Sequence, residues 1–319
     1  DIREESDPSR WSGEYKFPGS DGLITASVPS AMPSPASALV FNTRKELFAD
    51  LQVRQALLYA FDFEWANANL YSGLFQRTQG YFAGSELSAI DHPISPREQD
   101  ILAPWINRIP PTLQDGSFRL PVSDGSGHDR KTLRVAVDLL KSAGWEIRGN
   151  DLVNAKTGQP FSFDMTVTSP EQERIALHFQ RSLRQLGITM NIRQTDAAQF
   201  QRRLQAYDYD MIPVTWYNSL SPGNEQAFYW GSDGRTTPGT RNYPGIADPA
   251  IDAAIKALTA STSRDELVAA ARAIDRMLLS GVYTIPLYDP GGQWLARWRR
   301  IACPDNPPLM GFELTACWA

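Results

Sequence analysis

The sequence predicts an α/β fold in which helices pack on a sheet. The first observation is that strand and helix patterns alternate between residues 161 and 216, in the order strand, helix, strand, helix, strand, which is typical of helices packed on one sheet. The second is the composition, because 42% hydrophobic and 21% charged residues are ordinary globular values that argue against disorder or a coiled coil. With 319 residues, the chain has room for two domains or for one large lobe with appendages.

The N-terminal third passes from a loose to a regular pattern. Residues 1–37 are rich in Pro, Ser and Gly and contain one strand pattern, over 23–28. A strand is expected over 38–42 and a helix over 50–61, where apolar residues recur at helical spacing behind Asp50 as the N-cap. The next fifty residues mix turn residues with short apolar pieces, so they predict a long ordered loop over 76–127 with one helix near 97–107.

The alternating segment carries the clearest local signals. Residues 161–167 alternate with period two and predict a strand. The helix over 170–186 begins at a proline, has two Glu in its first turn and an apolar stripe, and ends before Gly187. The other expected elements are helices over 63–71, 130–142, 197–206, 248–260 and 264–279, a hairpin over 145–153, and strands over 188–192, 211–216, 283–288 and 294–298.

The stretch from Tyr209 to Trp230 has the composition of a recognition surface. Its strand over 211–216 contains Pro213, which cannot donate a ladder hydrogen bond, so we expect an edge strand, a bulge or an outward-facing position there. The loop that follows combines turn residues and amides with several aromatic rings. Such rings suit either a ligand wall or a plain core, because aromatic side chains dominate both.

Composition and charge exclude several function classes. The net charge is −5 and no basic block follows the chain, which argues against nucleic acid as a partner. No window has the 18 to 20 or so apolar residues that a membrane-spanning helix needs. The chain starts at Asp1 with neither an initiator methionine nor a signal-peptide pattern, so we expect a processed product or a fragment.

The reactive side chains give little sign of catalysis. The three histidines lie far apart and far from the cysteines, so no zinc site or His-based triad is expected, and no cofactor is predicted. No phosphate-binding glycine loop is present. For Cys303 and Cys317 we prefer a disulfide that closes the terminal loop, with two unpaired thiols as the alternative. The carboxylate pairs Asp208 with Asp210, and Asp62 with Glu64, leave a hydrolase open as an alternative.

A series of short patterns occurs in a fixed order along the chain. It begins with a strand, the segment Ala49-Asp50-Leu51-Gln52-Val53-Arg54-Gln55-Ala56-Leu57, and Phe61-Asp62-Phe63-Glu64. Further patterns follow over 77–82, 85–87, 152–161, 173–177, 186–188, 208–211, 219–226 and 242–249. In this order the series resembles the family 5 extracellular solute-binding proteins of ABC importers, in the YejA-like branch associated with oligopeptide and microcin C uptake.

The resemblance implies a periplasmic-binding-protein-like (class II) lobe with a mixed sheet and flanking helices, plus remnants of the other lobe. On that template, residues 1–37 are the tail of a mostly absent N-terminal lobe, 38–288 form the second ligand-binding lobe, and 289–319 return to the first lobe. The segments Val40–Asn42 and Ile285–Tyr288 would be the hinge strands. The chain would then be the C-terminal portion of such a protein.

The resemblance also implies a function without bond breakage. A periplasmic monomer would trap an oligopeptide or peptide-like compound between its lobes by hinge closure and present it to an inner-membrane ABC permease. The residues expected to contact ligand are Phe41, Asn42, Trp216, Tyr217, Asn218, Ser219, Asn224, Glu225, Tyr229 and Trp230.

One departure from the family pattern concerns the amino group of a peptide. In dipeptide and oligopeptide binders of the family, an acidic residue three positions after the Trp meets that group, and the corresponding position here is Ser219. Asp210 and Glu225 are left as candidates for the charge. The alternatives to peptide binding are import of another solute such as an oligosaccharide, a carboxylate-pair hydrolase, and an interaction module.

Overall fold

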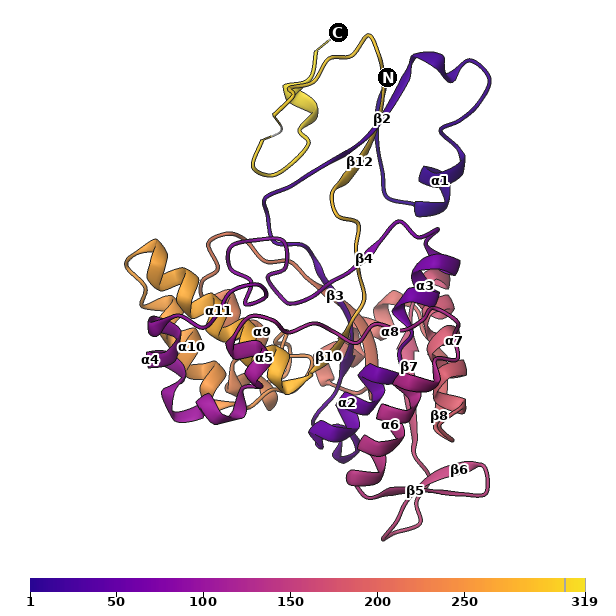
Figure 1. The fold of residues 1–319 in the computed structure, drawn as a ribbon, viewed down its shortest axis with the longest axis vertical. Coiled ribbons are helices and arrows are strands. Elements are labelled where there is room, and N and C mark those ends of the chain that lie inside the picture. Colours follow the sequence, from indigo (N-terminus) through magenta and orange to yellow (C-terminus); the bar gives the residue numbers. More distant parts are fainter. Residues whose placement is uncertain (307, 319) are drawn as a thin grey trace.

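The computed structural model describes residues 1–306 and 308–318 and confirms the α/β fold with a mixed sheet and flanking helices. Figure 1 shows a large α/β part and, at one end of it, a small sheet beside both chain termini. Pro307 and Ala319, within the C-terminal return expected over 289–319, lie outside the described residues.

A five-stranded sheet forms the centre of the large part. Its strand order is β10-β3-β9-β7-β8. Strand β3 is antiparallel to both of its neighbours, whereas β7 is parallel to both of its own. The strands are β3 (Ala36–Phe41), β7 (Ser162–Val167), β8 (Thr189–Gln194), β9 (Met211–Trp216) and β10 (Thr284–Pro286).

Helices cover both faces of this sheet and form an apolar core on each face (Figure 1). Because side chains alternate along a strand, Leu39 and Phe41 of β3 pack in one core and Val40 in the other. The helices of the first core are α2 (Leu51–Ala60), α3 (Phe63–Leu70), α6 (Arg130–Ser142) and α7 (Pro170–Arg184). Those of the second are α4 (Pro96–Leu102), α5 (Pro111–Gln114), α8 (Ala197–Ala206), α9 (Glu225–Trp230), α10 (Pro249–Thr259) and α11 (Arg264–Gly281).

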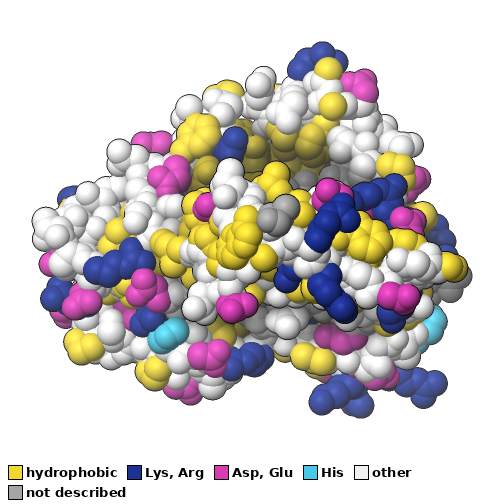
Figure 2. Space-filling view, turned by 90° about the horizontal axis from the view of Figure 1, so that it is seen from above, with side chains coloured by type: hydrophobic (Ala, Val, Ile, Leu, Met, Phe, Trp, Pro, Cys, Tyr) yellow, Lys and Arg dark blue, Asp and Glu magenta, His cyan; other side chains and the backbone are white. Residues whose placement is uncertain are grey.

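The small sheet is built from both ends of the chain. Its order is β1-β12-β2, with β1 (Ile2–Glu5), β2 (Leu23–Val28) and β12 (Gln293–Trp298), and α1 (Pro8–Gly13) lies beside it. Trp294 of β12 stacks between Trp11 of α1 and Phe75 of the large part, at ring-centroid distances of 5.7 and 5.5 Å. Seen from the side of the termini, the surface is recessed and hydrophobic side chains line the recess (Figure 2).

Shorter elements complete the chain. Strand β4 (Gln76–Arg77) pairs with β11 (Tyr288–Asp289), and β5 (Trp145–Arg148) forms a hairpin with β6 (Asp151–Asn154). Short 3₁₀ helices cover Ser20–Gly22, Glu46–Phe48, Ala103–Arg108, Ser232–Arg235 and Leu314–Ala316. A disulfide joins Cys303 to Cys317. In the described residues of the chain, no helix has the length and apolar character needed to cross a membrane.

The structure narrows one expectation of the sequence and corrects another. Of the three alternatives expected at Pro213, the edge strand is excluded, since β9 lies between β3 and β7. Its ladder with β7 consists of the single pair Met165↔Met211, so pairing on that side has ended before Pro213 and the missing N–H breaks no ladder there. The loop expected after β9 also contains a helix, α9, whose six residues begin without a side-chain cap from Asn224.

Candidate ligand-binding cleft

The order of the parallel strands places a crevice at one edge of the five-stranded sheet. The chain leaves β7, forms α7, enters β8 on one side of β7, and then returns through α8 to β9 on the other side. In open α/β sheets, ligands bind outside the carboxyl ends of strands at such a reversal. A hollow of about 150 Å³ lies at this point, and its lining includes Ser169 after β7, Thr215 of β9 and Tyr288 of β11.

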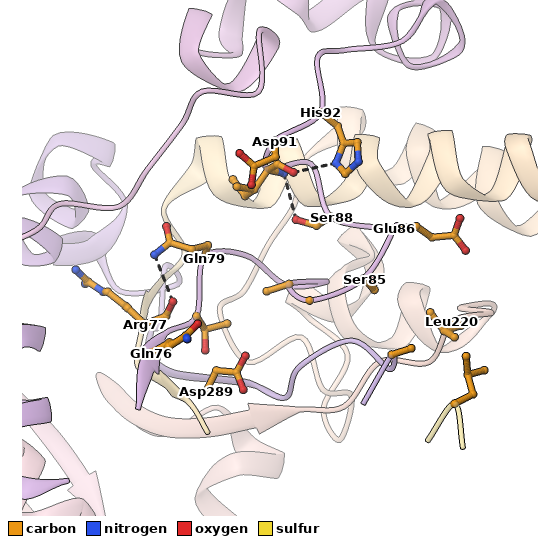
Figure 3. Close-up of a pocket in the computed structure, with 16 residues that line it drawn as sticks. Gln76, Arg77, Gln79, Ser85, Glu86, Ser88, Asp91, His92, Leu220 and Asp289 are labelled. Atoms are coloured by element: carbon orange, nitrogen blue, oxygen red, sulfur yellow. Dashed lines mark hydrogen bonds between the residues drawn. The ribbon is translucent and has the colours of Figure 1, made fainter. Parts of the chain in front are cut away.

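A larger hollow of about 680 Å³ lies beside it, between the large part and segments next to the small sheet. Ala31 and Leu309 line it from the side of the small sheet, and residues of the 76–92 segment line it from the large part. Leu220, from the loop after β9, and Asp289, which follows Tyr288, belong to the same lining (Figure 3). The volume is within the range of about 300–1,000 Å³ typical of ligand sites.

The wall formed by residues 76–92 is held from behind by Asp275 of α11. Its carboxylate accepts the backbone N–H of Tyr81 at 2.8 Å on one oxygen and that of Ala89 at 2.9 Å on the other. The side chain has no exposed surface, and this burial raises the pKa of Asp275 to about 6 although the two N–H groups act in the opposite direction. A Cβ on Gly80 would lie 3.0 Å from both carboxylate oxygens, so only glycine gives this close approach.

Arg276, the next residue of α11, is also fully buried and holds the same wall. Its Nε donates to Glu98 Oε2 at 2.6 Å, and neither side chain has exposed surface. Its Nη2 donates to the backbone oxygen of His92 at 2.6 Å, and Nη1 donates to that of Leu113. Asp275 and Arg276 therefore hold the wall at Tyr81, Ala89 and His92, in a segment that has no strand or helix after β4.

The aromatic residues predicted to bind ligand are mostly inside the protein. Trp216 and Trp230 are 1% and 0% exposed, with ring centroids 4.8 Å apart. Phe41 and Tyr229 are buried as well. Asn42 is buried and donates to the backbone oxygens of Tyr207 and Tyr209, at 3.1 and 2.8 Å.

A buried amide chain connects this aromatic group to the wall of the hollow. Trp230 Nε1 donates to Gln226 Oε1 at 3.0 Å, and Gln226 Nε2 donates to Asn218 Oδ1 at 2.9 Å. Asn218 Nδ2 in turn donates to the backbone oxygen of Tyr81 at 2.8 Å. The structure thus places Asn218 as a support for the wall, with its side-chain amide occupied.

The exposed members of the predicted set are Tyr217, which is 69% exposed, Ser219 and Asn224. Glu225 is half-buried, and its Oε1 accepts the backbone N–H of Gly223 at 2.8 Å. None of the ten predicted residues belongs to the lining of the 680 Å³ hollow, although Leu220 does. Their contact with ligand stays a prediction.

Two of the carboxylates discussed for charge recognition or hydrolysis, Asp208 and Asp210, form ion pairs at the far end of β9. Asp210 precedes the strand and contacts Lys45 Nζ at 3.3 Å, and Asp208 contacts Arg203 Nη1 at 2.9 Å. Since six strand residues span about 20 Å, Asp210 is a strand length away from Trp216 and the hollow beyond it.

Residues 1–238, three quarters of the chain, match the family described as "Bacterial extracellular solute-binding proteins, family 5 Middle". The chain belongs to this family. Two curated relatives of this family 5 chain are from Agrobacterium fabrum. "Peptidoglycan-binding protein YepA" is 42% identical over 99% of the chain and 52% of the relative, and "Probable peptide-binding protein YejA" is 39% identical over 100% and 52%.

A solved structure supports the fold of the family 5 chain. The oligopeptide-binding protein AppA from Bacillus subtilis, in complex with a nonapeptide, superposes with a TM-score of 0.67 at 18% identity, over 100% of this chain and 56% of AppA. The chain spans about half the length of the curated relatives that it matches. The names of YepA, YejA and AppA each describe binding, and none of them names a reaction.

Sequence reasoning missed the 76–92 wall, Asp275 and Asp289. Loops longer than about 12–15 residues without secondary structure are uncommon in compact domains and are usually functional or disordered. The expected ordered loop over 76–127 was therefore a usable signal for the wall. Asp275 gave no local signal, because its partners Tyr81 and Ala89 lie 194 and 186 residues away in the chain.

Proposed function

We propose that the full-length family 5 protein binds oligopeptides or peptide-like compounds in the cleft formed by the two neighbouring hollows. In this proposal, the protein acts as a periplasmic monomer that closes over the ligand and delivers it to the membrane permease of an ABC importer. The chain supplies the large α/β wall of the cleft. The names of the two Agrobacterium relatives, one peptidoglycan-binding and one peptide-binding, support this ligand class.

The observation that carries the proposal is the free backbone of residues 217–219. In the described residues of the chain, no backbone hydrogen bond involves the N–H or C=O groups of these three residues. They follow β9 in the chain, whose pairing with β3 ends at Trp216, and the next residue, Leu220, lines the larger hollow. An extended peptide can pair with such a segment as an added strand, which gives affinity without demanding one side-chain sequence.

Closure has a candidate axis where the chain passes between the small sheet and the large part, outside the segments 40–42 and 285–288 that the resemblance suggested as hinge strands. The two crossings are residues 29–35, between β2 and β3, and residues 290–292, between β11 and β12. The Ser34 hydroxyl donates to Asp289 Oδ2 at 2.5 Å, so the crossings meet at one point. Hinges of this kind need only a few residues at the ends of elements.

The test is calorimetry on the full-length protein with a pool of tri- to pentapeptides. We expect heat from the peptide pool, and binding about tenfold weaker or more for the same pool with N-methylated backbone amides, because these cannot donate to the free carbonyls. A pool of oligosaccharides is the comparison ligand. Binding of the sugars without binding of peptides would refute the ligand class and leave the family assignment intact.

A further inference from the structure

Three carboxylates line the 680 Å³ hollow, and two of them are already neutralised. Glu86 pairs with Arg264 at 2.5 Å between Oε1 and Nη2, and Asp91 pairs with Arg119. Asp289 makes no ion pair within residues 1–306 and 308–318. Of the three carboxylates in this lining, Asp289 is therefore the one whose charge is not balanced by a cation of the described residues.

The basic side chains of the lining do not pair with Asp289 within the described residues, although Arg77 Nη2 is buried there without a hydrogen-bond partner. Arg77 is 8% exposed, and its Nη1 and Nε donate to the backbone oxygens of Pro121 and Pro286 at 2.7 and 3.3 Å. Figure 3 shows the Arg77 side chain directed away from Asp289. His92 Nδ1 lies 2.9 Å from the backbone oxygen of Ile90. A ligand cation would therefore meet no competing protein cation at Asp289.

Asp289 is also held in one orientation. Its Oδ2 accepts the hydroxyl of Ser34 at 2.5 Å, and its Oδ1 accepts the backbone N–H of Gly291 at 2.8 Å. It is half-buried, and its backbone is paired with Gln76 in the β4–β11 ladder. An ionised carboxylate has about four acceptor positions, so these two bonds leave capacity for a ligand on a group whose position is already fixed.

A second polar group of the same lining lacks a partner. Thr78 is 2% exposed, and its Oγ1 makes no hydrogen bond in the described residues of the chain. A buried hydroxyl without a partner is unfavourable, and structures rarely keep one unless a ligand, water or ion satisfies it. The wall of the hollow therefore carries a free charge, and the Thr78 hydroxyl is buried without a partner inside the same wall.

We propose that Asp289 is the specificity-determining residue that binds a protonated primary amine of the ligand. The inference rests on the proposed function, since it assumes that a peptide-like compound enters the hollow. In this proposal, Asp289 of β11 supplies the negative charge that Ser219, in the loop after β9, does not supply. The ligands selected are those with a free ammonium group, either at the N-terminus of a peptide or on a side chain.

The experiment compares full-length wild type with Asp289→Asn by calorimetry, and Asp138→Asn, at an exposed position of α6 outside the lining, is the control. The probes are the tri- to pentapeptide pool and the same pool after N-acetylation. We expect wild type to bind the free-amine pool at least about tenfold more tightly, as charge-assisted hydrogen bonds imply. Asp289→Asn should reduce this preference to about twofold or less, and Asp138→Asn should keep it.

Further arms separate the possible outcomes. An α-acetylated pool with one lysine in each peptide shows whether a side-chain amine restores tight binding, and either source of the amine supports the proposal if Asp289→Asn abolishes the preference. Equal binding of free and acetylated pools by wild type overturns the role of Asp289 and leaves peptide binding intact. So does a preference that survives in a folded Asp289→Asn protein. If that variant does not fold, the wild-type comparison still decides. Absence of peptide binding by wild type overturns the proposed function itself.

Discussion

Replacing Asp275 by asparagine should change how the stability of the protein depends on pH. The carboxylate is fully buried, and burial raises its pKa from 3.8 to about 6. Between these values the folded protein holds a proton that the unfolded protein has released. Raising the pH through this window therefore lowers the free energy of unfolding, because the folded state must give up that proton and keep a charge without water.

The size of the effect follows from the two pKa values. Their difference is about 2.2 (6 − 3.8), and at 1.36 kcal/mol for each pKa unit this corresponds to about 3 kcal/mol across the window. Asparagine cannot titrate, so the variant lacks this term. It also keeps one acceptor for the two N–H groups of Tyr81 and Ala89, which costs about 1–3 kcal/mol. This second cost is the same at every pH, so it does not affect how the stability difference between wild type and variant changes with pH.

The assay is urea denaturation of wild type and Asp275→Asn at a series of pH values from about 4 to about 7. The free energy of unfolding of wild type minus that of the variant should fall by about 2–3 kcal/mol over this range. Asp138→Asn, at an exposed position of α6, is the control and should show no such trend. A difference between wild type and Asp275→Asn that stays constant with pH would refute the reasoning.

Three further substitutions test the wall and the free segment. Arg276→Met leaves the charge of Glu98 buried without a partner and should lower the free energy of unfolding by about 3–5 kcal/mol. Adding Glu98→Leu should restore part of this loss, and equal stability of the single and double variants in urea would contradict the prediction. Gly80→Ala forces a Cβ against the Asp275 carboxylate and should cost about 1–3 kcal/mol, measured in the same way. Tyr217→Ala, at a 69% exposed position, should change the free energy of unfolding by less than about 0.5 kcal/mol. It should also weaken peptide binding in calorimetry, and unchanged affinity would remove Tyr217 from the site.

The elements that sequence reasoning predicted are those with local signals. Asp50 begins α2 and its Oδ1 accepts the N–H of Gln52 at 2.8 Å, as an N-cap should. The helix that starts at Pro170 and the strand over 211–216 were predicted from spacing and end within two residues of the expected positions. Helix α9 was missed because it is six residues long, has no capping side chain and is rich in aromatic residues, which are weak helix formers.

The cleft could not be predicted in the same way, because its geometry depends on contacts between distant segments of the chain. The composition of 209–230 predicted a recognition surface, yet composition does not distinguish a ring that faces a ligand from one that faces a core. The resemblance favoured the first, and the structure buries Trp216 and Trp230. The role of Asp289 was equally hidden from the sequence. It stands out only because the other two carboxylates of the lining, Glu86 and Asp91, are paired with arginines in the structure.

The wall of the larger hollow and the aromatic stretch after β9 meet at the peptide groups of Tyr81. Asp275 of α11 accepts its N–H at 2.8 Å, and Asn218 donates to its carbonyl oxygen at 2.8 Å. The Tyr81 ring packs against Trp230, with centroids 5.1 Å apart. A segment without regular structure is thus fixed on both sides at one residue. The buried aromatic and amide residues after β9 therefore contribute to the cleft by holding its wall in place, and their truncation should weaken binding and stability together, whereas truncation of Tyr217 should weaken binding alone.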